Sequence, residues 1–333
     1  MNLNKNFISV CISAMFFLSF MTSCGCNDKN SAKHPVERPP LPSLPDFNAD
    51  SAYGFVKAQC DFGPRVPNTK EHKACGDYLV AKMNEWCDTV ISQTGMVTAF
   101  DGTRLNFRNI ISSFNPGTKR RILLFAHWDT RPWADQDTID TKKPALGADD
   151  GGSGVSVLME IARLLKSNRP DIGVDLIFFD AEDWGKSGGG SEADDSYALG
   201  TQYWTKNLHV PDYRADYGIL LDMVGSRQAQ FRREGFSKSE AGYVIERVWN
   251  IANRLGYGSY FLYEDGGYVT DDHVYVNEIN IPSIDIINSR MGTRSGFGEH
   301  WHTHRDNMDI IDRGTLKAVG QTIIAVIYYP ESV

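Results

Sequence analysis

The sequence predicts an α/β protein: one globular domain with a mostly parallel, twisted central sheet and helices on both faces. Short apolar runs of strand length alternate with longer segments whose apolar residues recur at helical spacing, which is typical of parallel sheets with helical crossovers. The chain has 333 residues, 41% of them hydrophobic and 23% charged, which is enough for one large domain. The formal net charge of −8 argues against nucleic acid as a partner. We expect a monomer.

Four short apolar runs predict the strands of this sheet. Continuous apolar runs of this length are typical of strands that are buried on both faces. They are residues 121–126 (RILLFA), 174–179 (VDLIFF), 217–221 (YGILL) and 282–287 (PSIDII).

Five segments predict helices between and around these strands. The clearest is 155–166, in which Leu158, Ile161, Ala162 and Leu165 follow the i, i+3, i+4, i+7 spacing of a helix face. The other four are 52–59, 70–85, 240–255 and 313–328.

The first 24 residues predict a signal peptide. Lys5 gives a positive start, and the apolar run at 7–20 (FISVCISAMFFLSF) is too short to span a bilayer comfortably. The run leads into MTSC, so Cys24 resembles the lipid-bearing cysteine of a bacterial lipoprotein; ordinary cleavage near an unmodified Cys24 is the alternative. We therefore expect an exported protein, either free in the bacterial periplasm or tethered by a lipid on Cys24 to a membrane that faces it.

The segment that follows separates the predicted signal peptide from the predicted globular domain. Residues 25–48 carry several prolines and little apolar content, which predicts an extended tether before a domain at 49–333. Within that domain, Cys60, Cys75 and Cys87 could form one disulfide, with Cys60–Cys75 as a candidate, or stay as three thiols. Their spacing fits no cysteine-based zinc site.

Acidic and imidazole side chains follow the predicted strands, at the edge where parallel sheets bind ligands. Several carboxylates that converge in a buried crevice repel one another and need a cation. Imidazole and carboxylate donors without thiolates suit Zn²⁺ with one open position, whereas Mg²⁺ prefers an octahedron of oxygens. The residues concerned are His127, Asp150, Glu182, Asp183, Asp222 and His302.

The adjacent acids Glu182 and Asp183 need separate roles. Successive side chains point in different directions as a strand ends, so one acid can bind the metal while the other faces the substrate as a general base and acid. A solvated acidic turn is the alternative interpretation, and the other acidic strand ends disfavour it.

The order of the motifs HWD, GADDGGSG, FFDAED, LLDMVG, DDH, PSID and WHT resembles the zinc aminopeptidase-type hydrolase family over nearly the whole predicted domain. Within it, the chain most resembles the glutaminyl cyclases of the animal-like type, in a bacterial version. The resemblance implies a zinc aminopeptidase-like fold and an enzyme whose partners are peptides with an N-terminal glutamine. Such enzymes convert this glutamine to pyroglutamate with release of ammonia, and more slowly convert N-terminal glutamate.

The resemblance also implies roles for single residues. Asp183 stands where the family usually has glutamate, so its shorter side chain leaves the detailed geometry open. Glu182 matches the general base and acid, and Asp222 and Asp271 match two aspartates that cyclases keep beside it. The residues matched to metal ligands are Asp150, Asp183 and His302.

Four residues are candidates for the substrate pocket. Trp301 matches an aromatic residue that lines it in the family, and Trp184 is expected at its mouth, with rim or core packing as the alternative. Asp285 falls where animal cyclases carry a histidine. His127 is either a pocket residue or an additional metal ligand.

The choice between cyclase and aminopeptidase depends on the metal count and the pocket. Aminopeptidases of this family bind two zinc ions, and the extra ligands His127 and Asp222 are present, so we expect one ion with a second as the alternative. Asp271 favours the cyclase, because aminopeptidases of this family have serine at the matching position. The Gly- and acid-rich insertion at 185–195 also favours the cyclase. A zinc aminopeptidase that releases N-terminal amino acids is the first alternative. A catalytically dead binding domain is the second, disfavoured because every expected position is filled.

Overall fold

The computed structural model describes residues 44–188, 190–290, 292–293 and 295–329. The predicted signal peptide, Cys24 and most of the predicted tether lie outside these residues, so export and lipidation stay predictions. Among the described residues, no helix has the length and apolar character needed to cross a membrane.

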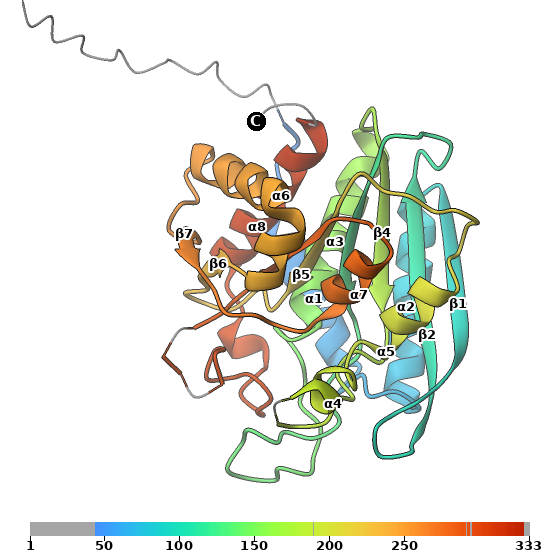
Figure 1. Ribbon diagram of the computed structural model, residues 1–333, viewed down its shortest axis with the longest axis vertical. Helices are drawn as coiled ribbons and strands as arrows, with labels where there is room; N and C mark the ends of the chain where they lie inside the picture. Colours follow the sequence, from blue (N-terminus) through green and yellow to red (C-terminus); the bar gives the residue numbers. More distant parts are fainter. Residues whose placement is uncertain (1–43, 189, 291, 294, 330–333) are drawn as a thin grey trace, which may run out of the picture. The chain divides into compact units, whose positions relative to one another are not determined.

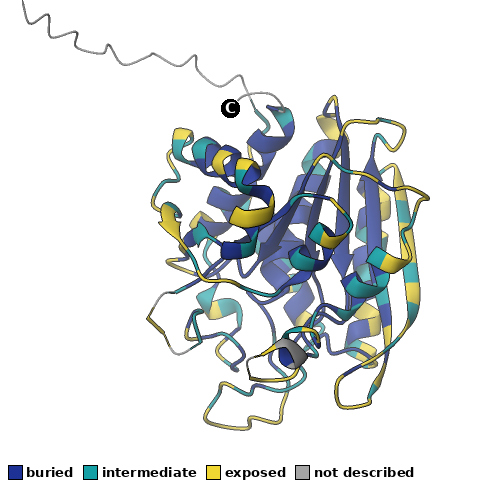
Figure 2. Cartoon of the chain, in the orientation of Figure 1, coloured by how far each residue is buried: buried dark blue, intermediate teal, exposed yellow. Residues whose placement is uncertain are grey.

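A six-stranded sheet forms the centre of the domain, in the order β1-β2-β4-β3-β5-β8 (Figure 1). The four strands predicted from apolar runs form its parallel part, and every residue in them is buried (Figure 2). This confirms the predicted fold class. The four strands are β3 (Arg121–His127), β4 (Gly173–Phe179), β5 (Gly218–Asp222) and β8 (Ser283–Ile287).

Two antiparallel strands that were not predicted extend the sheet on one side. β1 (Thr89–Thr98) pairs with β2 (Arg104–Phe114), which in turn pairs antiparallel with β4. The residues of β1 are exposed or half-buried along its whole length. An edge strand that faces solvent lacks the continuous apolar run by which the buried strands could be recognised.

Helices cover both faces of the sheet. On one face, α3 (Gly152–Ser167) packs against β3 and against three other helices. These are α1 (Ala49–Asp61), α2 (Lys70–Trp86) and α8 (Arg313–Tyr328). Its Gly154 allows close contact with β5, because a Cβ there would lie 2.0 Å from the carbonyl oxygen of Leu221. On the other face, α5 and α7 contribute Trp204 and Val276 to a core that also contains Phe125.

All five predicted helices are present, and short elements surround them. The predicted helices are α1 (Ala49–Asp61), α2 (Lys70–Trp86), α3, α6 (Gly235–Arg254) and α8 (Arg313–Tyr328). The additional elements are α4 (Ser191–Asp194), α5 (Leu199–Lys206), α7 (Asp272–Glu278), the 3₁₀ helix η1 (Met308–Ile310), and a small parallel sheet of β6 (Phe231–Arg233) and β7 (Phe261–Asp265).

The end of the predicted tether belongs to the folded domain, which corrects the expected boundary. Phe47 is 1% exposed, and its N–H donates to Oε1 of Gln321 at 2.9 Å. The ring fits over α8 because Gly320 lacks a side chain there; a Cβ would lie 2.2 Å from it. Asn48 then caps α1 by accepting the N–H of Ser51.

The three cysteines of the domain are free thiols, so the candidate disulfide between Cys60 and Cys75 is not formed. Burial raises the pKa of the Cys60 thiol to about 11, and those of Cys75 and Cys87 to about 12. Thiols with raised pKa values are poor nucleophiles and poor metal ligands at neutral pH.

We predict that Phe47→Ala lowers the free energy of unfolding by about 3–5 kcal/mol, because it removes a buried ring from a closed site. Phe100→Ala, at a position that is 45% exposed, is the matched control and should cost about 1 kcal/mol or less. Chemical denaturation measures both. Equal effects would contradict the assignment of Phe47 to the core.

Candidate metal centre and active site

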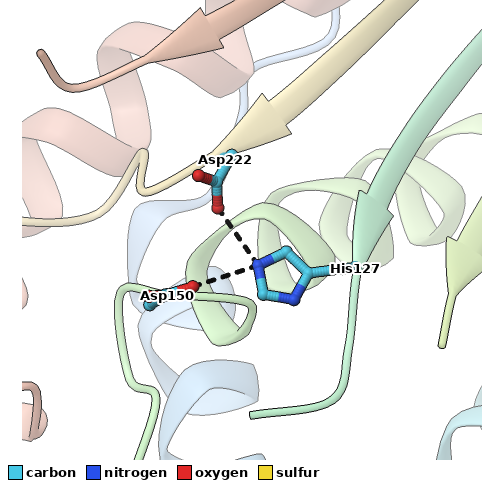
Figure 3. A group of neighbouring side chains, drawn as sticks. All are labelled: His127, Asp150 and Asp222. Atoms are coloured by element: carbon cyan, nitrogen blue, oxygen red, sulfur yellow. Dashed lines mark hydrogen bonds and ion pairs between the residues drawn. The ribbon is translucent and has the colours of Figure 1, made fainter. Parts of the chain in front are cut away.

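The carboxyl ends of three parallel strands bring the predicted site residues to one edge of the sheet. β3 ends at His127, β5 ends at Asp222, and the turn that carries Glu182 and Asp183 follows β4. Asp150 lies in the loop before α3, beside His127 and Asp222 (Figure 3). Gly151 lets this loop approach closely, because its φ is +83° and a Cβ would lie 2.7 Å from the carbonyl oxygen of Asp129.

The structure brings together the three residues that the sequence predicted as metal ligands. Asp150, Asp183 and His302 each offer one donor atom within 4.8 Å of the other two. Nε2 of His302 lies 3.3 Å from Oδ1 of Asp183 and 3.8 Å from Oδ2 of Asp150. Donors at about 2.0–2.2 Å from a tetrahedral zinc ion lie roughly 3.4 Å apart, so these separations suit a shared ion.

A second group of candidate ligands shares Asp150 with the first. Nε2 of His127 lies 3.1 Å from Oδ1 of Asp150 and 3.2 Å from Oδ1 of Asp222 (Figure 3). Asp150 therefore turns one oxygen toward His127 and the other toward His302. This geometry is compatible with a second ion.

The two histidines differ in the distance between their second ring nitrogen, Nδ1, and a neighbouring carboxylate. A metal-bound histidine almost always faces a carboxylate, a carbonyl or water with its second nitrogen. Nδ1 of His302 lies 3.2 Å from Oδ1 of Asp135, although it forms no hydrogen bond within the described part of the chain. Nδ1 of His127 lies 3.7 Å from Asp129 and has no hydrogen-bond partner among the described residues. His302 thus has a carboxylate closer to its second ring nitrogen than His127 has.

The buried acids of this crevice fit a divalent cation. Burial raises the pKa of Asp183, with a further contribution from Asp150, and Oδ2 of Asp183 has no hydrogen-bond partner in the described part of the chain. Buried carboxylates that are unpaired are costly, and a metal ion would remove that cost. The donor set of two carboxylates and an imidazole, with no thiolate, is one that metal ions of the zinc type accept.

Glu182 lies beside the first ligand group but belongs to neither of the two groups. Ala181, the residue before Glu182, has a left-handed backbone conformation with φ +55°. The carboxylate of Asp129 holds the turn by accepting the N–H groups of Glu182 and Asp183 at 3.0 and 3.1 Å. Burial, and after it the negative charge of Asp271, raises the pKa of Glu182 well above its ordinary value, against the effect of His127. Such a carboxylate can act as a general base and acid near neutral pH.

Asp222 and Asp271 lie next to Glu182, as the sequence predicted. Burial raises the pKa of Asp222 to about 7 although His127 lowers it, and burial together with Asp222 raises that of Asp271. Asp271 also caps α7 by accepting the N–H of Asp272 at 2.6 Å. The neighbouring Asp272 is itself buried and accepts a hydrogen bond from Thr201.

A cavity of about 370 Å³ opens onto these acids. Trp301 forms part of its wall and stacks on the ring of His302 at 3.7 Å. Asp194 from the predicted insertion also lines the cavity, and no lysine or arginine does so among the described residues. Aromatic lining residues that were not predicted are Tyr197, Tyr268 and Phe297.

Three candidates for the substrate pocket are not among the residues that line this cavity; for Trp184 and His127 the structure agrees with the alternative roles. Trp184 packs on Trp133 with ring centroids 5.7 Å apart, and its Nε1 donates to Asp101. His127 is buried behind Asp150 and Asp222, as a candidate ligand. Asp285 lies within β8, is fully buried, and has no hydrogen-bond partner for either carboxylate oxygen among the described residues.

The sequence matches peptidase family M28 over residues 109–327, and the chain belongs to this family. The match confirms the family resemblance that the order of the motifs predicted.

The similar proteins include glutaminyl cyclases. The solved structure of a Bacteroides thetaiotaomicron glutaminyl cyclase is 51% identical with a TM-score of 0.83, covering 86% of this chain and 99% of that one. That of a Zn-dependent exopeptidase from Parabacteroides distasonis is 54% identical with a TM-score of 0.84 and the same coverage. The glutaminyl-peptide cyclotransferase of Bos taurus is 28% identical over 262 residues, which are 69% of this chain and 66% of the bovine protein.

We predict that the metal-free protein becomes less stable as the pH rises. Burial raises the pKa of Asp222 to about 7 and that of Asp272 to about 8. Above about pH 4, these two carboxyl groups therefore keep their protons in the folded state, whereas they lose them in the unfolded chain. The free energy of unfolding should thus fall between about pH 4 and about pH 8. Against the effect of burial, Asp183 and Asp135 raise the pKa of His302 to about 9; its contribution has the same sign and is lost between about pH 6.5 and about pH 9.

Thermal unfolding with and without zinc measures this dependence. Zinc in hundredfold excess over its Kd should stabilise the folded state by about 2.7 kcal/mol. The dissociation constant itself should fall as the pH rises, because binding releases protons. Asp150→Asn, which removes the shared ligand, is the control and should not respond to zinc. A metal-free protein that gains stability from about pH 5 to about pH 8 would contradict the account.

Proposed function

We propose that the protein is a glutaminyl-peptide cyclotransferase, which converts the N-terminal glutamine of peptides to pyroglutamate with release of ammonia and, more slowly, N-terminal glutamate with release of water. The proposal rests on one observation. Glu182 lines the same small cavity as Asp150, Asp183 and His302, but it is not part of the group of candidate metal ligands that these three form. The similarity to two bacterial glutaminyl cyclases, each 51% identical over the aligned part of the chain, supports it.

Asp150, Asp183 and His302 would hold one Zn²⁺ ion, with a second ion between His127 and Asp222 as the alternative. When bound, zinc would polarise the side-chain carbonyl of the substrate glutamine and stabilise negative charge on its oxygen.

Glu182 carries the proton during cyclisation. The α-amine of the substrate forms a bond to the carbon of its own side-chain amide, and the bond from that carbon to the amide nitrogen breaks. Glu182 accepts the proton that the amine loses and gives it to the departing nitrogen, which leaves as ammonia. The raised pKa of Glu182 suits this role, because a higher pKa makes its carboxylate a stronger base toward the proton of the amine.

The remaining walls orient the substrate and keep water out. Asp222 and Asp271, which also line the cavity, can accept hydrogen bonds from the α-amine. Trp301 and Phe297, whose ring centroids are 4.9 Å apart, give the cavity an apolar wall. Folding the glutamine side chain against its own amine in a narrow space supplies the orientation that the reaction needs.

A zinc aminopeptidase is the second candidate, because Asp150 is shared between two groups of possible ligands. A solved structure of a Zn-dependent exopeptidase is also 54% identical to this chain. A peptidase has to deliver a water molecule to the peptide bond, whereas cyclisation needs none.

Incubation of the purified protein with a peptide that begins with glutamine separates the two reactions. Mass spectrometry should show the loss of one ammonia from the intact peptide. Release of free glutamine with a shortened peptide would support the aminopeptidase instead. A peptide that stays unchanged with and without added zinc would contradict both.

We also propose that the protein is exported and acts as a monomer on peptide N-termini outside the cytoplasm. The support is the apolar run at 7–20 with Cys24 after it. Mass analysis of the mature protein for a lipid on Cys24 distinguishes a tethered form from a free one.

We predict that Glu182→Gln lowers kcat by about 10²–10⁴-fold while zinc stays bound, because the amide keeps the shape of the side chain but cannot carry the proton. Steady-state kinetics and metal analysis on the same sample measure both quantities. Asp183→Asn is the matched control at the next residue and should lose zinc as well as activity. If Glu182→Gln loses zinc, the roles of the two acids are reversed.

A further inference from the structure

A buried guanidinium lies between the candidate metal ligands and the Gly-rich insertion. Arg131, four residues beyond the end of β3, is 1% exposed. Its plane lies over the rings of Trp133 and Tyr197, at 4.8 and 5.6 Å, and Tyr197 lines the cavity. A charge that is buried to this extent has to be satisfied by specific partners.

The first set of partners fixes the backbone of the turn that carries Asp183. Nη1 of Arg131 donates to the carbonyl oxygens of Asp183 and Gly185 at 2.9 and 2.8 Å, and it lies 3.6 Å from Oδ1 of Asp183. Nη2 donates to Oγ of Ser187 at 2.9 Å. Aspartate is a short ligand, so the place of its backbone determines where its carboxylate oxygens lie.

The second partner connects Arg131 to the imidazole ligand. Nε of Arg131 donates to Oδ1 of Asp135 at 3.1 Å, and the same oxygen lies 3.2 Å from Nδ1 of His302. Oδ2 of Asp135 accepts a hydrogen bond from Ser187 at 2.6 Å. One cation therefore reaches two of the three candidate ligands, Asp183 directly and His302 through Asp135.

We propose that Arg131 and Asp135 are positioning residues that hold Asp183 and His302 in the geometry that binds the metal and fix the insertion beside them. The inference rests on the proposed metal site. His127 provides the contrast, because its Nδ1 lies 3.7 Å from Oδ1 of Asp129, whereas Nδ1 of His302 lies 3.2 Å from Oδ1 of Asp135. Arg131 and Asp135 thus support the group of Asp150, Asp183 and His302, and we expect that group to bind zinc more tightly than the group with His127.

Two variants remove this support in different ways. Arg131→Lys keeps the charge but loses the planar fork that reaches two carbonyl oxygens at once. Asp135→Asn keeps the shape and removes the charge that faces His302. For each variant, the zinc dissociation constant measured by competition with a chromophoric chelator should rise by about 10–100-fold. The visible spectrum of the cobalt-loaded protein should change as well, because the ligands around the ion move.

Arg121→Lys is the matched control. Arg121 is a buried arginine at the start of β3, where it forks onto Asp175 at 2.6 and 2.7 Å. Its substitution should lower the melting temperature as much as Arg131→Lys does, because both break a buried ion pair. Its zinc dissociation constant should stay within about twofold of the wild type, since the two sites share no partner.

The outcomes separate this inference from the proposed site. Zinc affinity that is unchanged in both Arg131→Lys and Asp135→Asn would overturn it, as would an equal loss in Arg121→Lys. A wild-type protein that binds no zinc would instead overturn the metal site itself. If Arg131→Lys fails to fold, Asp135→Asn carries the test, because Asp135 is only half-buried.

Discussion

The constraint on which the rest depends is the repulsion between acids buried in one crevice. Asp150, Glu182, Asp183, Asp222 and Asp271 all line the cavity, and among the described residues no lysine or arginine joins them there. Such a set is stable only with a cation in its midst or with protons held on some of its members. A metal ion bound by Asp150 and Asp183, together with raised pKa values for Glu182, Asp222 and Asp271, would satisfy this constraint. Carboxyl groups with raised pKa values are also what acid–base catalysis needs.

Backbone contacts make the arrangement rigid. Asp129 accepts two N–H groups from the turn of Glu182 and Asp183. On the other side of the crevice, Asp306 accepts the N–H groups of Asp149 and Asp150 at 2.7 and 3.1 Å. Asp129 and Asp306 thus fix the backbone of the residues that carry the candidate ligands and Glu182. A preorganised site requires such support.

Much of the fold and most of the site could be predicted, because both follow from residues with strong preferences. The buried strands have continuous apolar runs, and parallel strands present their carboxyl ends at one edge, which places His127, Asp183 and Asp222 together. The exposed strand β1 lacks that signal. The contacts of Trp184 and Phe47 depend on how distant segments pack, and local sequence does not encode them. Arg131 and Asp135 are four residues apart and form an ion pair, but their sequence does not show that they support the candidate ligands. That role depends on how the loop brings them to Asp183 and His302.

The most direct test of the account is the position of the bound metal. Anomalous X-ray diffraction of zinc-loaded crystals should show an ion within about 2.0–2.2 Å of donor atoms from Asp150, Asp183 and His302, with Glu182 outside its coordination shell. An ion bound only between His127 and Asp222, or one that Glu182 coordinates in place of Asp183, would contradict the central claim.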